Sequence, residues 1–386
     1  MAYGQGNGRG MSEAWAAVRN VLCVRLDNLG DVLMTTPAMR ALKQSLPGRR
    51  LTLLASRSSA ALAPYVPDVD YVIAHDAPWV SHPVELPLAA ERDLLSELED
   101  RRFDAAVIFT VYSQSALPAA LFCRLAGIPL RLAYCRENPY RLLTHWVPEP
   151  EPQRLVRHEV RRQLDLVASV GCRTKDERLV FCVANEDRAR AVGKLRAAGV
   201  NTERPVIVIH AGASAPSRRY PPESFAAAAR SLAGRAGCQI VFTGSRDESA
   251  LIRRIRHGVP SSHSLAGKLE IGELAAVISL ASVLVSNNTG PVHVAAAVGT
   301  PVVDLYALTN PQHGPWRVPH RMLYRDVPCR FCYKSVCPEG HHHCLQQVAP
   351  AEVVSAALEL LADREYGGIG AGPRAWAPTE ALAMAG

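Results

Sequence analysis

A short acidic stretch, Arg25-Leu-Asp-Asn-Leu-Gly-Asp31, follows an apolar run that is typical of a buried strand. Ligands of open α/β sheets bind outside the carboxyl ends of the strands, so Asp27, Asn28 and Asp31 are expected to face a ligand. Asp31 stands at the predicted start of a helix, where the helix dipole favours the ionised carboxylate that a general base needs. The alternative is that Asp31 only caps the helix.

A second candidate is the turn Asn287-Asn-Thr-Gly290. It lies between an apolar β-branched run that begins at Val283 and a small-residue helical pattern that ends at Gly299. Pro291 suits the start of that helix, because its missing N–H would have no partner there anyway. Such a turn aims free backbone N–H groups and the positive end of a helix dipole at one point. It therefore predicts a phosphate site, with an ordinary capped helix as the alternative.

Two further strand ends carry charged side chains. A strand is expected to end at His210, and a loop of small residues then leads to Arg218 and Arg219, whose guanidinium groups could neutralise a diphosphate. After the next strand, Asp247 and Glu248 stand at a helix start, where a carboxylate could accept a hydrogen bond from a sugar or nucleoside hydroxyl. A solvated arginine pair and ordinary helix-terminal charge are the alternatives. Several such loops on one edge favour a nucleotide cleft, while the dinucleotide and P-loop glycine motifs are absent from the sequence.

A cysteine cluster lies near the C-terminal end, in an otherwise irregular segment that also contains three consecutive histidines. Its members are Cys329, Cys332, Cys337 and Cys344. Cysteines this close together are typical of tetrahedral zinc and iron–sulfur sites, although the spacing is not that of paired Cys-x2-Cys knuckles. We expect a structural zinc, with reduced thiols packed in a loop as the alternative.

Strands that alternate with helices must position these residues, and this pattern predicts parallel doubly wound sheets. Strands are expected at 21–26, 51–55, 71–73, 105–109 and 178–183, and then at 206–210, 239–243, 283–286 and 302–303. The domain organisation that we expect comprises a flexible extension over 1–19, a first domain over 20–190, a second domain with the cysteine cluster over 191–349, a helix over 350–364 and a disordered tail over 365–386.

Composition supports a globular protein of two domains, with 386 residues, 48% of them hydrophobic and 20% charged. The net charge of +7 is scattered, and no basic block interleaved with aromatic residues is present, so nucleic acid is not an expected partner. Without a visible signal peptide or an apolar run long enough to span a bilayer, we expect a cytoplasmic protein.

Four segments together resemble glycosyltransferase family 9, the lipopolysaccharide heptosyltransferases. They are residues 29–42, 210–225, 287–293 and 329–344. The resemblance implies a GT-B fold, in which two Rossmann-like domains face a cleft, with the acceptor on the N-terminal side and the nucleotide sugar on the C-terminal side. It implies inverting, metal-independent transfer of heptose from ADP-L-glycero-β-D-manno-heptose to the lipopolysaccharide inner core, so that no cofactor is required for catalysis. It also implies a lipid-linked or saccharide acceptor, a peripheral contact with the inner membrane, and a last helix that crosses back to the first domain.

The resemblance also implies a role for individual residues. Asp31 matches the proposed base, and Arg218 takes the place of a lysine that stabilises the departing diphosphate. The residues expected on the donor side are Ser214, Arg218, Glu248, Asn288, Thr289, Gly290 and His293. On the acceptor side we expect Asn28 and Arg57.

Two departures from the family pattern leave alternatives open. Asn288 holds the place of an aspartate, and it can form hydrogen bonds but cannot act as a base. Arg218 and Tyr220 replace a lysine and a tryptophan, which keeps charge and aromaticity but alters geometry. The alternatives are a transferase for another nucleoside-diphosphate sugar, a sugar-nucleotide hydrolase or epimerase, and a non-catalytic module that binds an anion and a metal.

Overall fold

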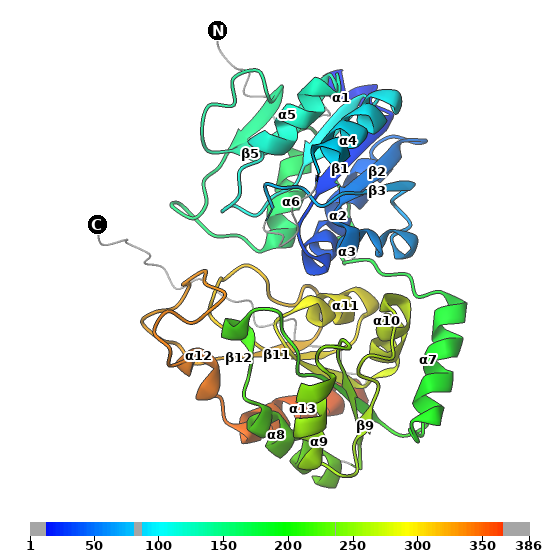
Figure 1. Ribbon diagram of the computed structural model, residues 1–386, viewed down its shortest axis with the longest axis vertical. Coiled ribbons are helices and arrows are strands. Elements are labelled where there is room, and N and C mark those ends of the chain that lie inside the picture. Colours follow the sequence, from blue (N-terminus) through cyan, green and yellow to red (C-terminus); the bar gives the residue numbers. More distant parts are fainter. Residues whose placement is uncertain (1–12, 81–86, 236, 366–386) are drawn as a thin grey trace.

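The computed structural model describes residues 13–80, 87–235 and 237–365, which form two halves, each built on a parallel six-stranded sheet (Figure 1). The strands of the first sheet are β1 (Asn20–Arg25), β2 (Arg50–Ala55), β3 (Tyr71–Ala74), β4 (Ala105–Ile108), β5 (Leu130–Cys135) and β6 (His145–Pro148). Its helices are α1 (Glu13–Ala16), α2 (Leu29–Gln44), α3 (Arg57–Ala60), α4 (Leu88–Asp100), α5 (Leu117–Leu125) and α6 (Glu159–Ala168). The sheet has the order β3-β2-β1-β4-β5-β6.

The second half repeats this plan. Its strands are β7 (Val206–His210), β8 (Gln239–Thr243), β9 (His263–Ser264), β10 (Val283–Asn287), β11 (Val302–Leu305) and β12 (His320–Leu323), in the order β12-β11-β10-β7-β8-β9. Its helices are α7 (Asn185–Ala197), α8 (Pro222–Arg235), α9 (Ser249–His257), α10 (Ile271–Leu280), α11 (Gly290–Val298), α12 (His343–Gln346) and α13 (Pro350–Glu365). The central strands are buried along their whole length, which explains their continuous apolar runs.

The strand order reverses once in each sheet, between β1 and β4 in the first and between β10 and β7 in the second. These reversals are the positions where doubly wound sheets bind ligands, at the carboxyl ends of the strands. The expected fold class, with two Rossmann-like domains of the GT-B type, is confirmed. The two halves meet where α2 packs against α11, and one buried apolar cluster continues from the first half into α10 and α11. Among the described residues, no helix combines the length and apolar character needed to cross a bilayer.

The structure differs from three expected features of the domain organisation. Residues 13–19 are not a free extension, because Trp15 is fully buried in the first core, whereas residues 1–12 lie outside the described part. A division after residue 190 would cut α7, which packs against α10 and belongs wholly to the second half. The last helix, α13, packs against α8 and the second sheet and does not cross back to the first half, as Figure 1 shows. The expected tail lies outside the described residues from 366 onward.

Candidate active site

Asp31 lies in the first turn of α2, which follows the carboxyl end of β1. Its carboxylate accepts a hydrogen bond from the backbone N–H of Asn28 over 3.2 Å and lies 3.2 Å from Nη2 of Arg25. The side chain is 13% exposed. Asp31 therefore caps its helix, as one interpretation of the sequence predicts, and also keeps contact with solvent, as the base interpretation requires.

The buried Arg25 side chain is surrounded by three carboxylates. Arg25 lies 2.9 Å from Asp27, 3.2 Å from Asp31 and 2.9 Å from Glu159 of α6. Burial alone would lower the pKa of Arg25, but the three carboxylates raise it, so the guanidinium stays charged. Burial also raises the pKa of Glu159, and the charge of Arg25 opposes that shift. Glu159 was not predicted from the sequence, because it stands 134 residues from Arg25.

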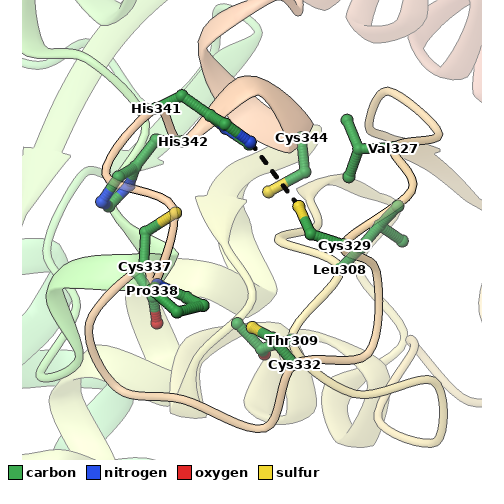
Figure 2. Close-up of a pocket in the computed structure, with 11 residues that line it drawn as sticks. Leu308, Thr309, Val327, Cys329, Cys332, Cys337, Pro338, His341, His342 and Cys344 are labelled. Atoms are coloured by element: carbon green, nitrogen blue, oxygen red, sulfur yellow. Dashed lines mark hydrogen bonds between the residues drawn. The ribbon is translucent and has the colours of Figure 1, made fainter.

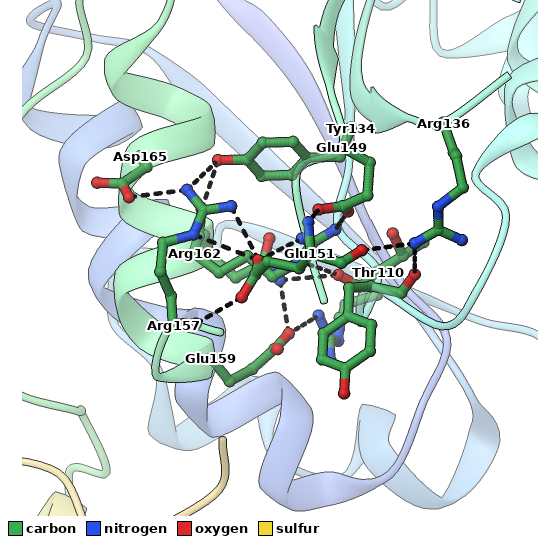
Figure 3. Close-up of polar contacts among 12 residues, drawn as sticks. Thr110, Tyr134, Arg136, Glu149, Glu151, Arg157, Glu159, Arg162 and Asp165 are labelled. Carbon is green, nitrogen blue, oxygen red and sulfur yellow. Dashed lines mark hydrogen bonds and ion pairs between the residues drawn. The ribbon is translucent and has the colours of Figure 1, made fainter. Parts of the chain in front are cut away.

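Behind Arg25, a network of ion pairs fixes the wall of the first half (Figure 3). Arg162 of α6 pairs with Glu149 and Glu151, and Arg157 also pairs with Glu151. Gln163 connects this network to the partner of Arg25, because its amide donates to Glu159 over 2.6 Å and to the Thr110 carbonyl, which also accepts a hydrogen bond from Arg162. Buried charges of this kind are tolerated when they are paired, so the network holds this wall of the first half in one arrangement.

On the other side of the interface, β10 ends at Asn287 and α11 begins at Gly290, as the sequence predicts. Thr289 is the N-cap, in an extended conformation, and Gly299 ends the helix in the left-handed region with a φ of 80°. The Asn287 side chain ties the turn to the loop after β7, because it accepts a hydrogen bond from Tyr220 N and donates one to Ala211 O. Pro291 has no N–H and the Val292 N–H donates to Thr289 O over 3.0 Å, so within the described structure the Gly290 N–H remains available to an anion at this helix end.

Asn288 points into the second half beneath this turn. Its amide donates to Oδ2 of Asp304 over 2.8 Å and to the carbonyl of His313 over 3.0 Å. Burial raises the pKa of Asp304 to about 8, although the bond from Asn288 opposes the shift. Asp304 and His313 were not predicted, because nothing in the sequence near either residue marks it as part of a site.

The buried carboxyl of Asp304 predicts a pH-dependent stability. Its folded-state pKa lies above the unfolded value, so the folded state binds the extra proton, and raising the pH from about 4 to about 8 favours unfolding. We expect the Tm of the wild type to fall relative to that of Asp304→Asn across this range, because the asparagine keeps an acceptor for Asn288 but does not titrate. Thermal melts at a series of pH values measure this. Asp100→Asn on the exposed side of α4 is the matched control, and parallel pH profiles for Asp304→Asn and the wild type would contradict the prediction.

A cation and two neutral histidines lie near Asp304. The Arg218 side chain has no hydrogen-bond or ion-pair partner within the described ranges, and its charge helps lower the pKa values of His293 and His313. Burial is the larger cause for both, and it lowers the pKa of His293 to about 3. Nδ1 of His293 and Nε2 of His313 are buried without a hydrogen-bond partner in the described structure. Such polar atoms are uncommon in folded proteins and are available to a ligand.

Glu248 lies at the loop edge of the same sheet. Its carboxylate accepts a hydrogen bond from Ser245 N over 2.8 Å and stands 3.8 Å from Nε2 of His210. Gly212 makes room for it, since a Cβ at that position would lie only 1.8 Å from Oε1 of Glu248. Ser214 is exposed in the neighbouring loop. Glu248 and Ser214 therefore both lie in loops of the second half, where the donor was expected.

The two residues expected on the acceptor side, Asn28 and Arg57, differ in their contacts with Asp31. Asn28 is exposed and its backbone holds Asp31. Arg57, on α3, has a side chain that is 65% exposed and lies 3.5 Å from Asp76. In the described structure Arg57 therefore contacts Asp76 and not the Asp31 carboxylate.

The two helix N-termini face each other across the interface. A Cβ on Gly30 of α2 would lie 2.6 Å from the His293 ring of α11, and a Cβ on Gly290 would lie 3.5 Å from Leu29. Gly30 therefore permits the close approach of the two helices. The turn that carries Asp31 lies against the turn that carries Thr289 and Gly290, so the structure brings the expected base and the expected phosphate site together.

Comparison with known proteins places this arrangement in a family. Residues 92–343 match the model of Glycosyltransferase family 9 (heptosyltransferase). The chain belongs to glycosyltransferase family 9. It is 25% identical to lipopolysaccharide heptosyltransferase 2 of Escherichia coli K12 over 353 residues, which cover 87% of this chain and 97% of that protein.

Solved structures agree on the fold of this family 9 glycosyltransferase. A family 9 glycosyl transferase from Veillonella parvula superposes with a TM-score of 0.78 at 21% identity, covering 92% of this chain and 100% of the other. The ADP-heptose lps heptosyltransferase II of Escherichia coli superposes with a TM-score of 0.71 at 23% identity, covering 90% and 99%. The activity class, glycosyl transfer, follows from the family.

The cysteine cluster of this glycosyltransferase surrounds a small cavity (Figure 2). Sγ of Cys329 lies 3.7 Å from Nε2 of His341, and burial raises the pKa of the Cys344 thiol. Over residues 13–80, 87–235 and 237–365, no group of three or more His, Cys, Asp or Glu side chains is arranged to hold a metal ion. The structure thus gathers the expected ligand types in one place without forming a ligand shell.

Proposed function

We propose that this protein transfers heptose from ADP-L-glycero-β-D-manno-heptose to a saccharide of the lipopolysaccharide inner core, with inversion and without a catalytic metal. The observation that carries the proposal is the meeting of the two helix N-termini, one with Asp31 and one with Thr289 and Gly290. The name of the Escherichia coli relative supports the donor and the acceptor class.

The proposed reaction is a single displacement. Asp31 takes the proton from an acceptor hydroxyl as that oxygen attacks the anomeric carbon of the donor. The bond from the anomeric carbon to the phosphate oxygen breaks, and ADP leaves with the electron pair. Attack from the face opposite the leaving group inverts the anomeric configuration.

The departing diphosphate needs positive charge, and the chain offers two sources. The Gly290 N–H, at the positive end of the α11 dipole, would donate to it, and Arg218 can form paired hydrogen bonds with phosphate oxygens. The neutral His293 and His313 add hydrogen-bonding nitrogens that are free within the described structure. Glu248, with Ser214 nearby, would accept hydrogen bonds from donor hydroxyls.

Incubation of the purified protein with ADP-heptose and deacylated inner-core oligosaccharide tests this function. We expect ADP release that depends on the acceptor, a heptosylated product of inverted configuration by NMR, and an unchanged rate in EDTA. Equal ADP release without acceptor would indicate a hydrolase. Tight donor binding without product in any acceptor screen would indicate a non-catalytic module. A thermal-shift screen of nucleoside-diphosphate sugars identifies the donor, since a bound ligand raises the Tm.

The place of action follows from the acceptor class. A lipid-linked acceptor and a net charge of +7 favour work at the cytoplasmic surface of the inner membrane, as a peripheral protein. Co-sedimentation with anionic vesicles at low and high salt tests this, and binding that is absent at low salt would contradict it.

We further propose a structural zinc at the cysteine cluster. The loop that carries the cysteines is joined to the Arg218 loop, because Ser217 N–H donates to Ser335 O over 2.9 Å and Ser217 Oγ donates to Lys334 O over 2.8 Å. Binding would require the thiols to close on the metal, and it would stabilise the folded state.

Metal analysis under reducing conditions is the test. We expect about one equivalent of zinc per chain, and a lower Tm with loss of metal in Cys332→Ser. Cys182→Ser, at an exposed cysteine outside the cluster, is the matched control. Less than about half an equivalent of zinc would contradict the proposal.

A further inference from the structure

A polar cavity of about 150 Å³ opens in the first half, beside the carboxylates that surround Arg25. Its lining comes from residues 112–116 after β4, residues 134–137 at the end of β5, and Glu149. Both segments lie at the carboxyl edge of the sheet, next to the reversal between β1 and β4. No residue of this lining was predicted from the sequence to bind a substrate.

A chain of side-chain contacts joins this cavity to the proposed base. Gln114 in the lining donates to Asp27 over 2.5 Å, Asp27 lies 2.9 Å from Arg25, and Arg25 lies 3.2 Å from Asp31. The cavity is therefore separated from the Asp31 carboxylate by only two side chains. A molecule seated in the cavity would therefore lie next to the side chains that hold Asp31.

The lining offers both hydrogen-bond donors and acceptors on small side chains. Ser115 donates to the Glu137 carboxylate over 3.1 Å, and Ser113 and Gln114 are exposed beside it. One nitrogen of Arg136 donates to the backbone carbonyls of Tyr112 and Glu151, which fixes the guanidinium at the wall. Mixed donors and acceptors of this kind match the hydroxyl groups of a sugar better than an acyl chain or a phosphate alone.

The back wall of the cavity is prearranged by the buried ion network (Figure 3). The Glu149 side chain is 4% exposed and pairs with Arg162, and the Tyr134 hydroxyl accepts a hydrogen bond from Arg157. Both cavity residues are thus held by partners on the far side. A wall that is already ordered loses little entropy when a ligand binds.

We propose that this cavity binds a sugar residue of the acceptor, next to the residue whose hydroxyl attacks the donor. This proposal rests on the proposed function, because it assumes that the acceptor is a saccharide. Tyr112 of the lining also forms a hydrogen bond with Tyr333 of the second half, so the occupant adjoins the contact between the halves. The subsite would select the acceptor by the sugar that precedes the reacting one.

Ser113→Trp tests the subsite by filling it from an exposed position in a turn. We expect the KM for deacylated inner-core oligosaccharide to rise at least about tenfold while the KM for ADP-heptose changes less than about twofold. Ser96→Trp, at an exposed position on α4, is the matched control for an added indole and should match the wild type. Glu137→Gln, which keeps the side-chain shape, should raise the acceptor KM by a smaller factor. An unchanged acceptor KM in Ser113→Trp would overturn the proposal.

A second measurement separates this inference from the proposed function. Saturation-transfer NMR with the oligosaccharide and no donor reports acceptor binding without turnover. Saccharide binding to the wild type that Ser113→Trp abolishes would support the subsite even if ADP-heptose gave no product. Equal binding by the two proteins, or no binding by the wild type, would overturn it.

Discussion

Replacing Asp31 by asparagine is expected to lower kcat about a thousandfold, the range that a positioned general base contributes. The asparagine side chain can still accept the hydrogen bond from Asn28 N, so the helix cap remains, but it cannot take a proton. ADP binding, measured by calorimetry, should stay within about twofold because the residues that we propose to contact the donor lie in the second half.

The comparison of two variants separates the base from the cap. Asp31→Ala loses both functions, so it should be as inactive as Asp31→Asn and less stable by about 1 kcal/mol. If Asp31→Asn retained near-full transfer while Asp31→Ala lost it, Asp31 would be a cap and the base would lie elsewhere.

Replacing Arg218 by glutamine is expected to lower kcat by about a hundredfold or more, because charge develops on the diphosphate as it departs. The charge of Arg218 acts on His293, His313 and Asp304, and its side chain has no ion-pair partner in the described structure. Its charge is therefore available to the donor. Stopped-flow or coupled assays of ADP release measure the effect.

Two control variants test whether the effect depends on the paired donors of Arg218 and on its position. Arg218→Lys keeps a point charge without the paired donors, so we expect partial activity. Arg235→Gln, at the exposed end of α8, removes one positive charge far from the turn and should behave as the wild type. A loss in Arg235→Gln equal to that in Arg218→Gln would assign the effect to net charge.

Local signals explain why the turn at 287–290 was predicted well. Its strand, proline, and closing Gly299 are all encoded within a few residues, and the structure forms each of them. The partners of Asp31 could not be found in the same way. Glu159 reaches Arg25 only because α6 packs on α2, and no local pattern records that contact.

Burial also overrides strand propensity. The apolar segment 178–183 was expected to be a strand, yet it pairs with no sheet in the described structure. Its backbone bonds go elsewhere, from Val180 N to the Thr36 hydroxyl and from Cys182 N to Tyr65 O. The segment is apolar because it lies on the core as it leads into α7. Conversely, β5 was missed because Arg131 interrupts an otherwise apolar run.

The meeting of α2 and α11 has a consequence for the order in which substrates bind. Asp31 places a negative charge at the N-terminus of α2, whereas the first turn of α11 carries no acidic side chain, so a diphosphate is attracted to the α11 side and repelled by the α2 side. The donor should therefore bind first on the α11 side, and the acceptor should enter the space that remains next to Asp31. Product-inhibition kinetics test this order of binding. We expect ADP to be a competitive inhibitor with respect to the donor and not with respect to the acceptor.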